Sequence, residues 1–430
     1  MSSSSSSEAS TKADASPAAR VVRGEGSDNN GNISKIQVVD PQQHGSGVNS
    51  YVSYKVNTET DRKQFDQSRF TVVKRYSDFD WLRQHLVRTY PGVIVPPLPE
   101  KSVMKKTESS FVEMRRRALQ TFLNRIANHE VLSRDETFRR FLQDSADMFA
   151  LHKKTVEEVN DTKSGGLASK LFTSATSAFR SATRSTAEER PKTDDDLLFD
   201  EVVGYIGGLT PQLANVQKHT GNLVLSGKEL SSAMFEFGEA FKVLGKSEDQ
   251  EKAPKLAKAL AAVGTTADGI SATTAETAQR INVRFLEQVK DYARMITAVQ
   301  GAIQQRREAQ NAFWEAQEDL DKKEQAHNKV AGVAGKEGKA AKAREEWTAA
   351  QEAHEAARRH HEKVTATFFR EVGNFKGQKV QDFRAMLLDF IQLQIDHSKK
   401  VEEDWSRVLP SLEEIVREPE ETEDTSATSV

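Results

Sequence analysis

The side chains best suited to chemistry in this chain are Arg75 and Tyr76, in the sequence RYSDF at 75–79. A guanidinium group can hold a phosphate through two parallel hydrogen bonds. The tyrosine ring beside it offers a flat, largely apolar face on which a sugar ring can lie. Further basic residues follow before residue 118: a lysine at the end of PPLPEK (96–101) and three consecutive arginines at 115–117. This combination is suited to a phosphorylated sugar.

The order of RYSDF, PPLPEK and RRR resembles the PX (Phox homology) module, which binds phosphoinositides. In that family the arginine of the motif contacts the 3-phosphate and the next aromatic residue stacks on inositol, which implies these roles for Arg75 and Tyr76. The lysine after the proline-rich turn binds the 1-phosphate, which implies Lys101. An arginine early in the next helix binds the 4- and 5-hydroxyls, which implies Arg115, with Arg116 as the alternative register.

Structural roles for the same residues remain open. Lys74 and Arg75 are, in this second interpretation, solvated charges at a strand end, while Tyr76 and Phe79 belong to a core. PPLPEK is also compatible with a ligand for an SH3 domain, because PxxP segments adopt the polyproline II helix that such domains bind.

Residues 33–148 are predicted to fold as the α+β unit that positions these side chains. Runs of β-branched and aromatic residues at 33–39, 51–56 and 70–73 indicate three antiparallel strands. A helix should begin after the third strand, with Ser77 or Asp78 as its cap. The segment PGVIVPPLPEK interrupts helical structure, because proline cannot continue a helix. A second helical region is expected at about 109–144.

Beyond residue 190 the pattern is almost purely helical. Apolar or small residues from Phe199 to Leu244 alternate spacings of three and four, and similar seams run from Ile281 to Leu320 and from Val364 to Trp405. Turns are expected at 245–254 and 328–341. Helices on the order of 100 Å long do not fit a compact monomer. We therefore expect an all-α, elongated, antiparallel three-helix coiled coil at 194–416, whose exposed seams predict a dimer.

A PX-like unit followed by such a coiled coil resembles the PX–BAR sorting nexins, and the SDFDWL and PPLPEKS stretches look most like the plant and algal retromer-associated members. The resemblance implies binding to phosphatidylinositol 3-phosphate membranes on the cytosolic face of early or sorting endosomes. It also implies a homodimer, or a heterodimer with another PX–BAR sorting nexin, with retromer core subunits and cargo receptors as further partners. The alternative is a coiled-coil tether or scaffold that uses its PX unit only as a membrane address.

Three segments are candidates for direct membrane contact. The linker at 163–190 includes LASKLFTSATSAFRSATR (167–184), which predicts an interfacial amphipathic helix because one face is apolar and the other bears no acidic residue. A disordered linker and a helix packed on the protein are the alternatives. The PX resemblance implies an apolar wedge at 93–95, and the turn between the second and third helices offers lysines, each worth about 1 kcal/mol near an anionic surface. The residues concerned are Leu167, Leu171 and Phe179 in the linker, Val93, Ile94 and Val95 in the wedge, and Lys329, Lys336, Lys339 and Lys342 in the turn.

Other classes of function find little support. A net charge of −3, from 61 basic and 64 acidic residues, gives no overall field for nucleic acid. The absence of cysteine excludes disulfides and thiol catalysis. GKS at 245–247 lacks the first glycine of a P-loop, and the histidines at 354, 360 and 361 lack zinc-site spacing. We predict no catalysis, cofactor or metal, no membrane-spanning run, and disordered tails at 1–32 and 417–430.

Overall fold

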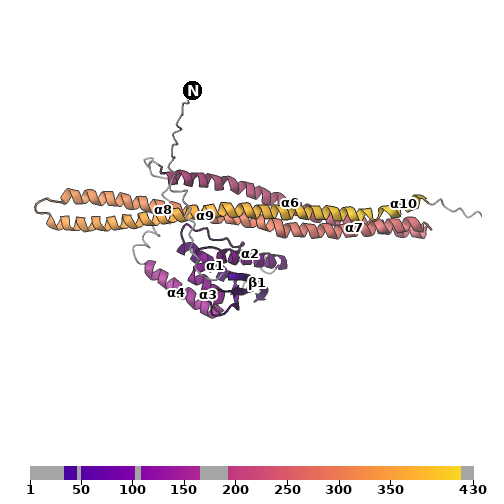
Figure 1. Ribbon diagram of the computed structural model, residues 1–430, viewed down its shortest axis with the longest axis horizontal. Coiled ribbons are helices and arrows are strands. Elements are labelled where there is room, and N and C mark those ends of the chain that lie inside the picture. Colours follow the sequence, from indigo (N-terminus) through magenta and orange to yellow (C-terminus); the bar gives the residue numbers. More distant parts are fainter. Residues whose placement is uncertain (1–32, 46–49, 102–107, 165–191, 418–430) are drawn as a thin grey trace, which may run out of the picture.

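The computed structural model describes residues 33–45, 50–101, 108–164 and 192–417, and the account below concerns these ranges. A small α+β unit lies against the middle of a long bundle of helices (Figure 1). The α+β unit followed by long helices confirms the predicted fold class. The residues of the linker helix, including Leu167, Leu171 and Phe179, lie outside the described residues.

Three antiparallel strands form the sheet, in the order β1 (Ile33–His44), β2 (Tyr51–Thr60) and β3 (Arg69–Arg75). Val38 pairs with Val56, which pairs with Val72, so the buried valines line one face. The outer edge of β1 is covered by α2 (Ser109–Ala127), whose Gln120 accepts the Val38 N–H and whose Arg116 donates to the Val38 carbonyl. This edge is therefore protected from pairing with another strand.

The first helix, α1 (Tyr76–Thr89), follows β3 with no residue between them. The N-cap is Arg75, and the Asp78 carboxylate accepts the Arg75 N–H at 3.0 Å from within the first turn. The helix therefore begins earlier than the expected cap at Ser77 or Asp78, because Asp78 can cap from inside the helix. As a result Arg75 and Tyr76 stand at a sharp strand-to-helix junction.

The remaining helices of this unit are a short 3₁₀ turn, η3 (Leu132–Arg134), and the α-helices α3 (Glu136–Gln143) and α4 (Ala146–Ser164). The boundary predicted at residue 148 falls inside α4, and the neighbouring Phe149 is buried in the core against Phe141. Lys74 is buried too: its Nζ donates to the Asp144 carbonyl at 2.8 Å and lies 4.4 Å from the Phe149 ring centre. The interpretation of Lys74 as a solvated charge is therefore wrong.

The long helices are α6 (Asp194–Gln250), α7 (Pro254–Ile281), α8 (Glu287–Val330) and α9 (Glu337–Ser406), followed by α10 (Leu409–Arg417). A π-helical turn, η4 (Asn282–Leu286), joins α7 to α8 into one rod. The two expected turns are shorter than predicted and comprise residues 251–253 and 331–336. Gly332 and Gly335 have positive φ, which allows the tight turn between α8 and α9, called the tip below.

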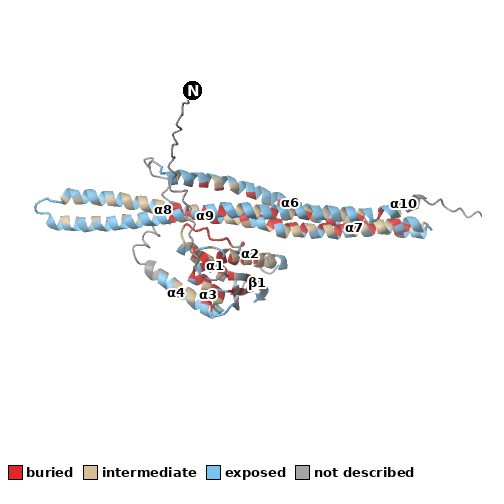
Figure 2. Cartoon of the chain, in the orientation of Figure 1, coloured by how far each residue is buried: buried red, intermediate tan, exposed pale blue. Residues whose placement is uncertain are grey.

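The second half of the predicted seam of α6 includes exposed residues, and α7 packs on a neighbouring stripe of α6. Small residues pack against α7: a Cβ added to Gly238 would lie 2.7 Å from the Gly264 carbonyl oxygen, and Ser231 bonds with Ser271. Large apolar residues spaced by seven are exposed instead, consistent with the pale-blue outer side of α6 in Figure 2. They are Val216, Leu223, Leu230, Phe237 and Leu244.

Candidate functional site

The side chain of Tyr76 is the centre of the candidate headgroup site. Its hydroxyl donates to the Pro99 carbonyl at 2.6 Å, which ties the first turn of α1 to the proline-rich segment. The Arg115 guanidinium carbon lies 4.7 Å from the Tyr76 ring centre and 4.4 Å from that of Phe111. Burial raises the pKa of Tyr76, so its hydroxyl stays protonated at neutral pH.

Arg115 is buried, with 6% of its surface exposed, and donates to the Glu100 carbonyl at 3.0 Å. Its Nε is buried and makes no hydrogen bond within the described part of the chain. Arg116 points elsewhere, to the Val38 carbonyl and the Glu113 carboxylate. The geometry therefore favours Arg115 over the alternative register at Arg116.

The two other predicted cations are exposed. Lys101 lies 3.6 Å from an Asp80 oxygen, and Arg75 lies 3.9 Å from an Asp78 oxygen. Exposed pairs of this length contribute little to stability, so both cations are available to a phosphate. The structure thus links Tyr76, Arg115 and the segment ending at Lys101, with Arg75 next to them at the end of β3.

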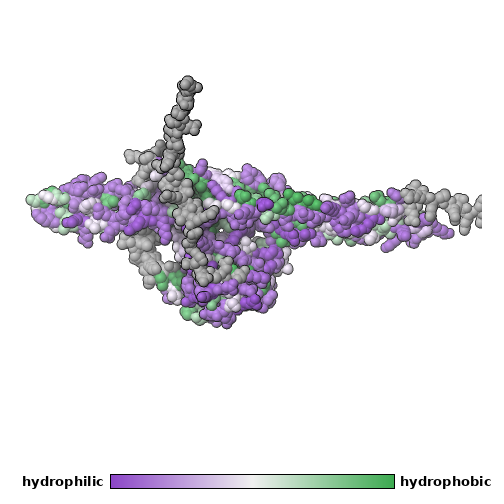
Figure 3. Space-filling model, in the orientation of Figure 1, coloured by the Kyte–Doolittle hydropathy of each residue, from purple (hydrophilic) through white to green (hydrophobic). Residues whose placement is uncertain are grey.

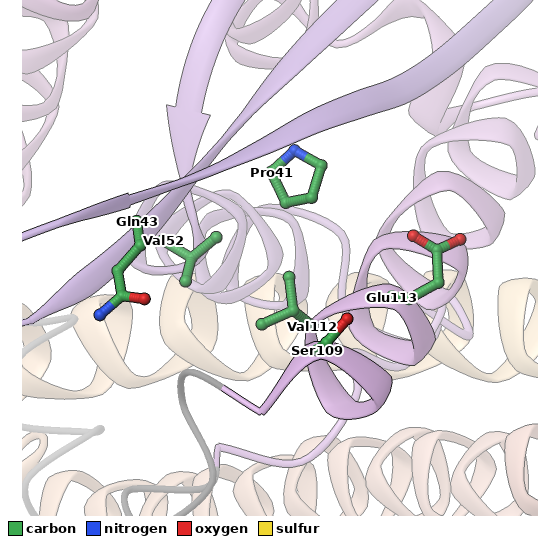
Figure 4. A pocket seen from close by; sticks show the side chains of 6 residues that line it. All are labelled: Pro41, Gln43, Val52, Ser109, Val112 and Glu113. Carbon is green, nitrogen blue, oxygen red and sulfur yellow. The ribbon is translucent and has the colours of Figure 1, made fainter.

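A groove of about 310 Å³ lies near this site without including its residues. Figure 4 shows it between the β1–β2 strands and the start of α2. Its one charged lining residue is Glu113, whose pKa is lowered by hydrogen bonds from Arg116. A carboxylate that stays ionised at neutral pH makes this groove unsuited to a phosphate. Its lining residues are Pro41, Gln43, Val52, Ser109, Val112 and Glu113.

The predicted apolar wedge is not supported by the structure. Val93, Ile94 and Val95 are buried, at 6%, 7% and 2% exposure. Val93 and Val95 belong to the core of the α+β unit, while Ile94 enters the core formed by α6, α8 and α9. Ile94 is covered by the long helices, a contact that the local sequence does not reveal.

Several residues that join the α+β unit to the long helices were missed by the sequence analysis. Arg117 forms two hydrogen bonds with Glu287, at 2.6 and 3.0 Å. His129 contacts Glu371 at 2.9 Å, and Arg125 contacts Asp291 at 2.5 Å. Each pair is separated by more than 160 residues in the sequence, so no local pattern could identify it.

Arg306 is a second missed feature, because it interrupts an apolar seam and yet is buried, with 1% exposure. It donates to Asp196 at 2.6 Å and to Gln310 at 2.7 Å, and its guanidinium carbon lies 4.4 Å from the Phe199 ring centre. Burial opposes ionisation of Asp196, but hydrogen bonds from Arg306 and Thr193 outweigh it and lower the pKa to about 2. This cluster fastens the start of α6 to α8.

One predicted site remains, the lysines of the turn between α8 and α9, and the rejected P-loop candidate can also be placed. The tip lysines Lys329, Lys336, Lys339 and Lys342 are all exposed. The GKS sequence lies within α6, far from any P-loop geometry. Among the described residues there is no helix long and apolar enough to cross a bilayer, and no group of three or more histidine or acidic side chains placed to hold a metal.

Comparison with known proteins agrees with this architecture. Residues 62–145 match the PX domain family, and residues 169–411 match the family described as Vps5 C terminal like. Sorting nexin 1 of Arabidopsis thaliana is 31% identical over 380 residues, which cover 88% of this chain and 92% of the relative. Human sorting nexin-2 is 30% identical over 90% of this chain and 74% of its own length.

A cryo-EM structure of the SNX-BAR protein Mvp1, a tetramer, matches with a TM-score of 0.58 at 16% identity, covering 87% of this chain and 99% of that one. At this identity the match supports the fold alone. The Vps5-like match extends over more than half of the chain, and the Arabidopsis relative is aligned over nearly all of it. The protein therefore belongs to the PX–BAR sorting nexins, a family of non-enzymatic proteins.

Proposed function

We propose that this sorting nexin recognises phosphatidylinositol 3-phosphate on the cytosolic face of early or sorting endosomes. The observation that carries the proposal is the convergence of Arg115 and the Pro99–Lys101 segment on the ring of Tyr76, with the exposed Arg75 adjacent. Arg75 would bind the 3-phosphate, Lys101 the 1-phosphate, and Tyr76 the face of the inositol ring. Arg115, already fixed by the Glu100 carbonyl, would bind the 4- and 5-hydroxyls.

The charges around the site support a negative ligand. The carboxylates paired with the exposed cations, Asp78 and Asp80, lie on α1, two and four residues after Tyr76. Asp78 is engaged by Lys153 at 2.7 Å and by the Arg75 N–H, so its charge is already balanced when Arg75 turns to a phosphate. A bidentate phosphate contact is stronger than the exposed contact it replaces.

The test is cosedimentation with liposomes that carry one phosphoinositide at a time. Wild type should pellet selectively with the 3-phosphate lipid, and Arg75→Ala should not. Arg69→Ala is the matched control, because Arg69 also lies on β3 but pairs with Glu59 at the opposite end of the strand. Equal binding to all anionic lipids, or equal loss in both variants, would refute the assigned pocket.

We also propose that the protein dimerises through the exposed apolar face of α6 and α9. Figure 3 shows apolar surface gathered over α6. In a soluble protein, an exposed face of this length is expected to be covered by a second helical surface. That surface would come from a second copy or from another PX–BAR sorting nexin. The exposed residues of α9 are Val380, Leu387, Leu388, Ile391 and Ile395.

Such a dimer would sense or induce membrane curvature with the help of the 167–184 segment and the tip lysines. Two tips per dimer would double the contacts with an anionic surface and so raise avidity. Electron microscopy of liposomes tests this: tubules from wild type but not from Phe179→Glu support it. Smooth vesicles with bound wild type would instead favour the tether that uses PX only as an address. Retromer core subunits and cargo receptors are the partners to test in this role.

A further inference from the structure

The segment from Gly92 to Lys101 joins the helical bundle to the candidate headgroup site. It begins in contact with α8 and α9 and ends at the lysine assigned to the 1-phosphate. Residues 92–97 and 99 are buried, although the segment has no helical or strand structure. A buried irregular segment must have its backbone groups satisfied by specific partners, and those partners lie at both of its ends.

At the bundle end, Gln305 of α8 holds the backbone by two hydrogen bonds. Its Oε1 accepts the Gly92 N–H at 2.9 Å, and its Nε2 donates to the Val87 carbonyl at 2.9 Å. Gly92 has a φ of 87°, and a Cβ added there would lie 2.7 Å from the Val364 carbonyl oxygen of α9. Only glycine fits this position, because the chain rests directly on the backbone of α9.

Two residues later, Ile94 is held in the same way. Its side chain lies in the core of the bundle, and its N–H donates to a Glu371 oxygen at 3.4 Å. The same oxygen accepts from His129 Nε2 at 2.9 Å. The His129 Nδ1 accepts the N–H groups of Val131 and Leu132, which fixes the ring proton on Nε2. Glu371 thus joins α9 to two separate parts of the α+β unit.

At the end next to the candidate headgroup site, three side chains of the α+β unit hold the same segment. Arg83 donates to the Pro96 carbonyl at 3.0 Å, Tyr76 to that of Pro99, and Arg115 to that of Glu100. Between the two ends, Pro96, Pro97 and Pro99 each fix one backbone angle. Little conformational freedom is therefore left between Ile94 and Lys101, and a displacement at one end is carried to the other.

We propose that the long helices α8 and α9 position the headgroup site through this segment, with Gln305 and Glu371 as positioning residues for Pro99–Lys101. The inference rests on the proposed headgroup function. Contiguous packed and hydrogen-bonded groups can carry such coupling between sites. When the bundle releases Gly92 and Ile94, the segment gains freedom, and Lys101 and the carbonyl that orients Arg115 are no longer held in register with Tyr76.

The test uses the full chain and the water-soluble headgroup inositol 1,3-bisphosphate, so that neither curvature nor avidity contributes. Gln305→Ala should weaken its binding about fivefold in calorimetry, and Gly92→Ala should weaken it at least as much. Gln304→Ala is the matched control, because Gln304 is the exposed neighbour on α8 and its side chain bonds with Glu308 of the same helix. Hydrogen exchange of the Val93, Ile94 and Val95 amides, which donate to Tyr90, Glu371 and Val93 in the folded chain, is a second readout; measured without ligand, it should accelerate only in Gln305→Ala and Gly92→Ala.

Weaker binding and faster exchange in Gln305→Ala, with Gln304→Ala like wild type, would support the inference. Wild-type affinity and wild-type exchange in both Gln305→Ala and Gly92→Ala would overturn it. A wild-type chain that does not bind the headgroup would refute the proposed function instead. In that case the exchange rates alone decide whether the bundle holds the segment.

Discussion

Replacing Asp196 with asparagine removes the negative charge that holds α6 on α8 and that also accepts hydrogen bonds from Thr193. The carboxylate accepts from Arg306 and Gln310, each at 2.6 Å, and Arg306 has almost no access to water. Asparagine keeps the size of the side chain but removes its charge. The buried guanidinium then loses its counter-charge, and that loss, more than the pair itself, is what destabilises such a variant.

The magnitude follows from the pKa of Asp196, which is lowered from 3.8 to about 2. At 1.36 kcal/mol per pKa unit, this shift corresponds to about 2 kcal/mol of stability. Because the folded pKa lies below the unfolded one, the contribution is complete above about pH 4. It is lost as the pH falls from about 4 to about 2, where the carboxylate becomes protonated in both states.

The assay is urea unfolding followed by far-UV circular dichroism, with the full chain at fixed concentration and several pH values. Asp196→Asn should unfold at lower urea than wild type at pH 7, and the difference should shrink as the pH falls below about 4. Asp195→Asn is the control, since Asp195 is exposed and loses the same charge from the same helix turn. Equal losses in the two variants, or a difference independent of pH, would refute the reasoning.

Three further outcomes follow from the described contacts. If the proposed dimer forms through α6, wild type should have the mass of two chains in light scattering and Phe237→Glu that of one, since Phe237 is exposed on the apolar face of α6. Lys74→Met should raise the free energy of unfolding at pH 7 in urea titrations, because burial lowers the Lys74 pKa from 10.5 to about 8. The stability of wild type should approach that of the variant as the pH rises from about 8 to 10.5, where the lysine becomes neutral in both the folded and the unfolded state. Gly238→Ala should lower the melting temperature, because its Cβ would meet the Gly264 carbonyl, whereas Gly204→Ala has open space and should raise it.

Local sequence patterns were sufficient where the structure depends on near neighbours. Runs of β-branched and aromatic residues placed the three strands, and the long heptad pattern placed the three long helices. RYSDF could be located at a strand end because the chain changes there from period two to helical spacing. The four headgroup residues remain a prediction, although three of them are linked through Tyr76 and the adjoining segment.

Contacts between distant segments could not be predicted from local sequence patterns. The seam of α6 reads as one apolar stripe, but its Leu230 and Phe237 are exposed, and the residues that follow them, Ser231 and Gly238, face α7 instead. The heptad spacing is the same for both faces, so it does not show which residues meet which partner. The turn expected at 245–254 is largely helical for a related reason: Gly245 packs against Ala257, and this tertiary contact overrides the weak helical propensity of glycine.

The 93–95 stretch shows why an apolar run does not by itself identify a membrane wedge. Moving these side chains from protein to lipid gives no hydrophobic gain, because both surroundings exclude water. It would, however, break the hydrogen bonds of Gly92 to Gln305 and of Ile94 to Glu371. It would also expose the surfaces of α8 and α9 that Ile94 now covers. The free energy therefore favours the contact between the PX unit and the long helices. Any lipid contact here would require the PX unit to leave the bundle.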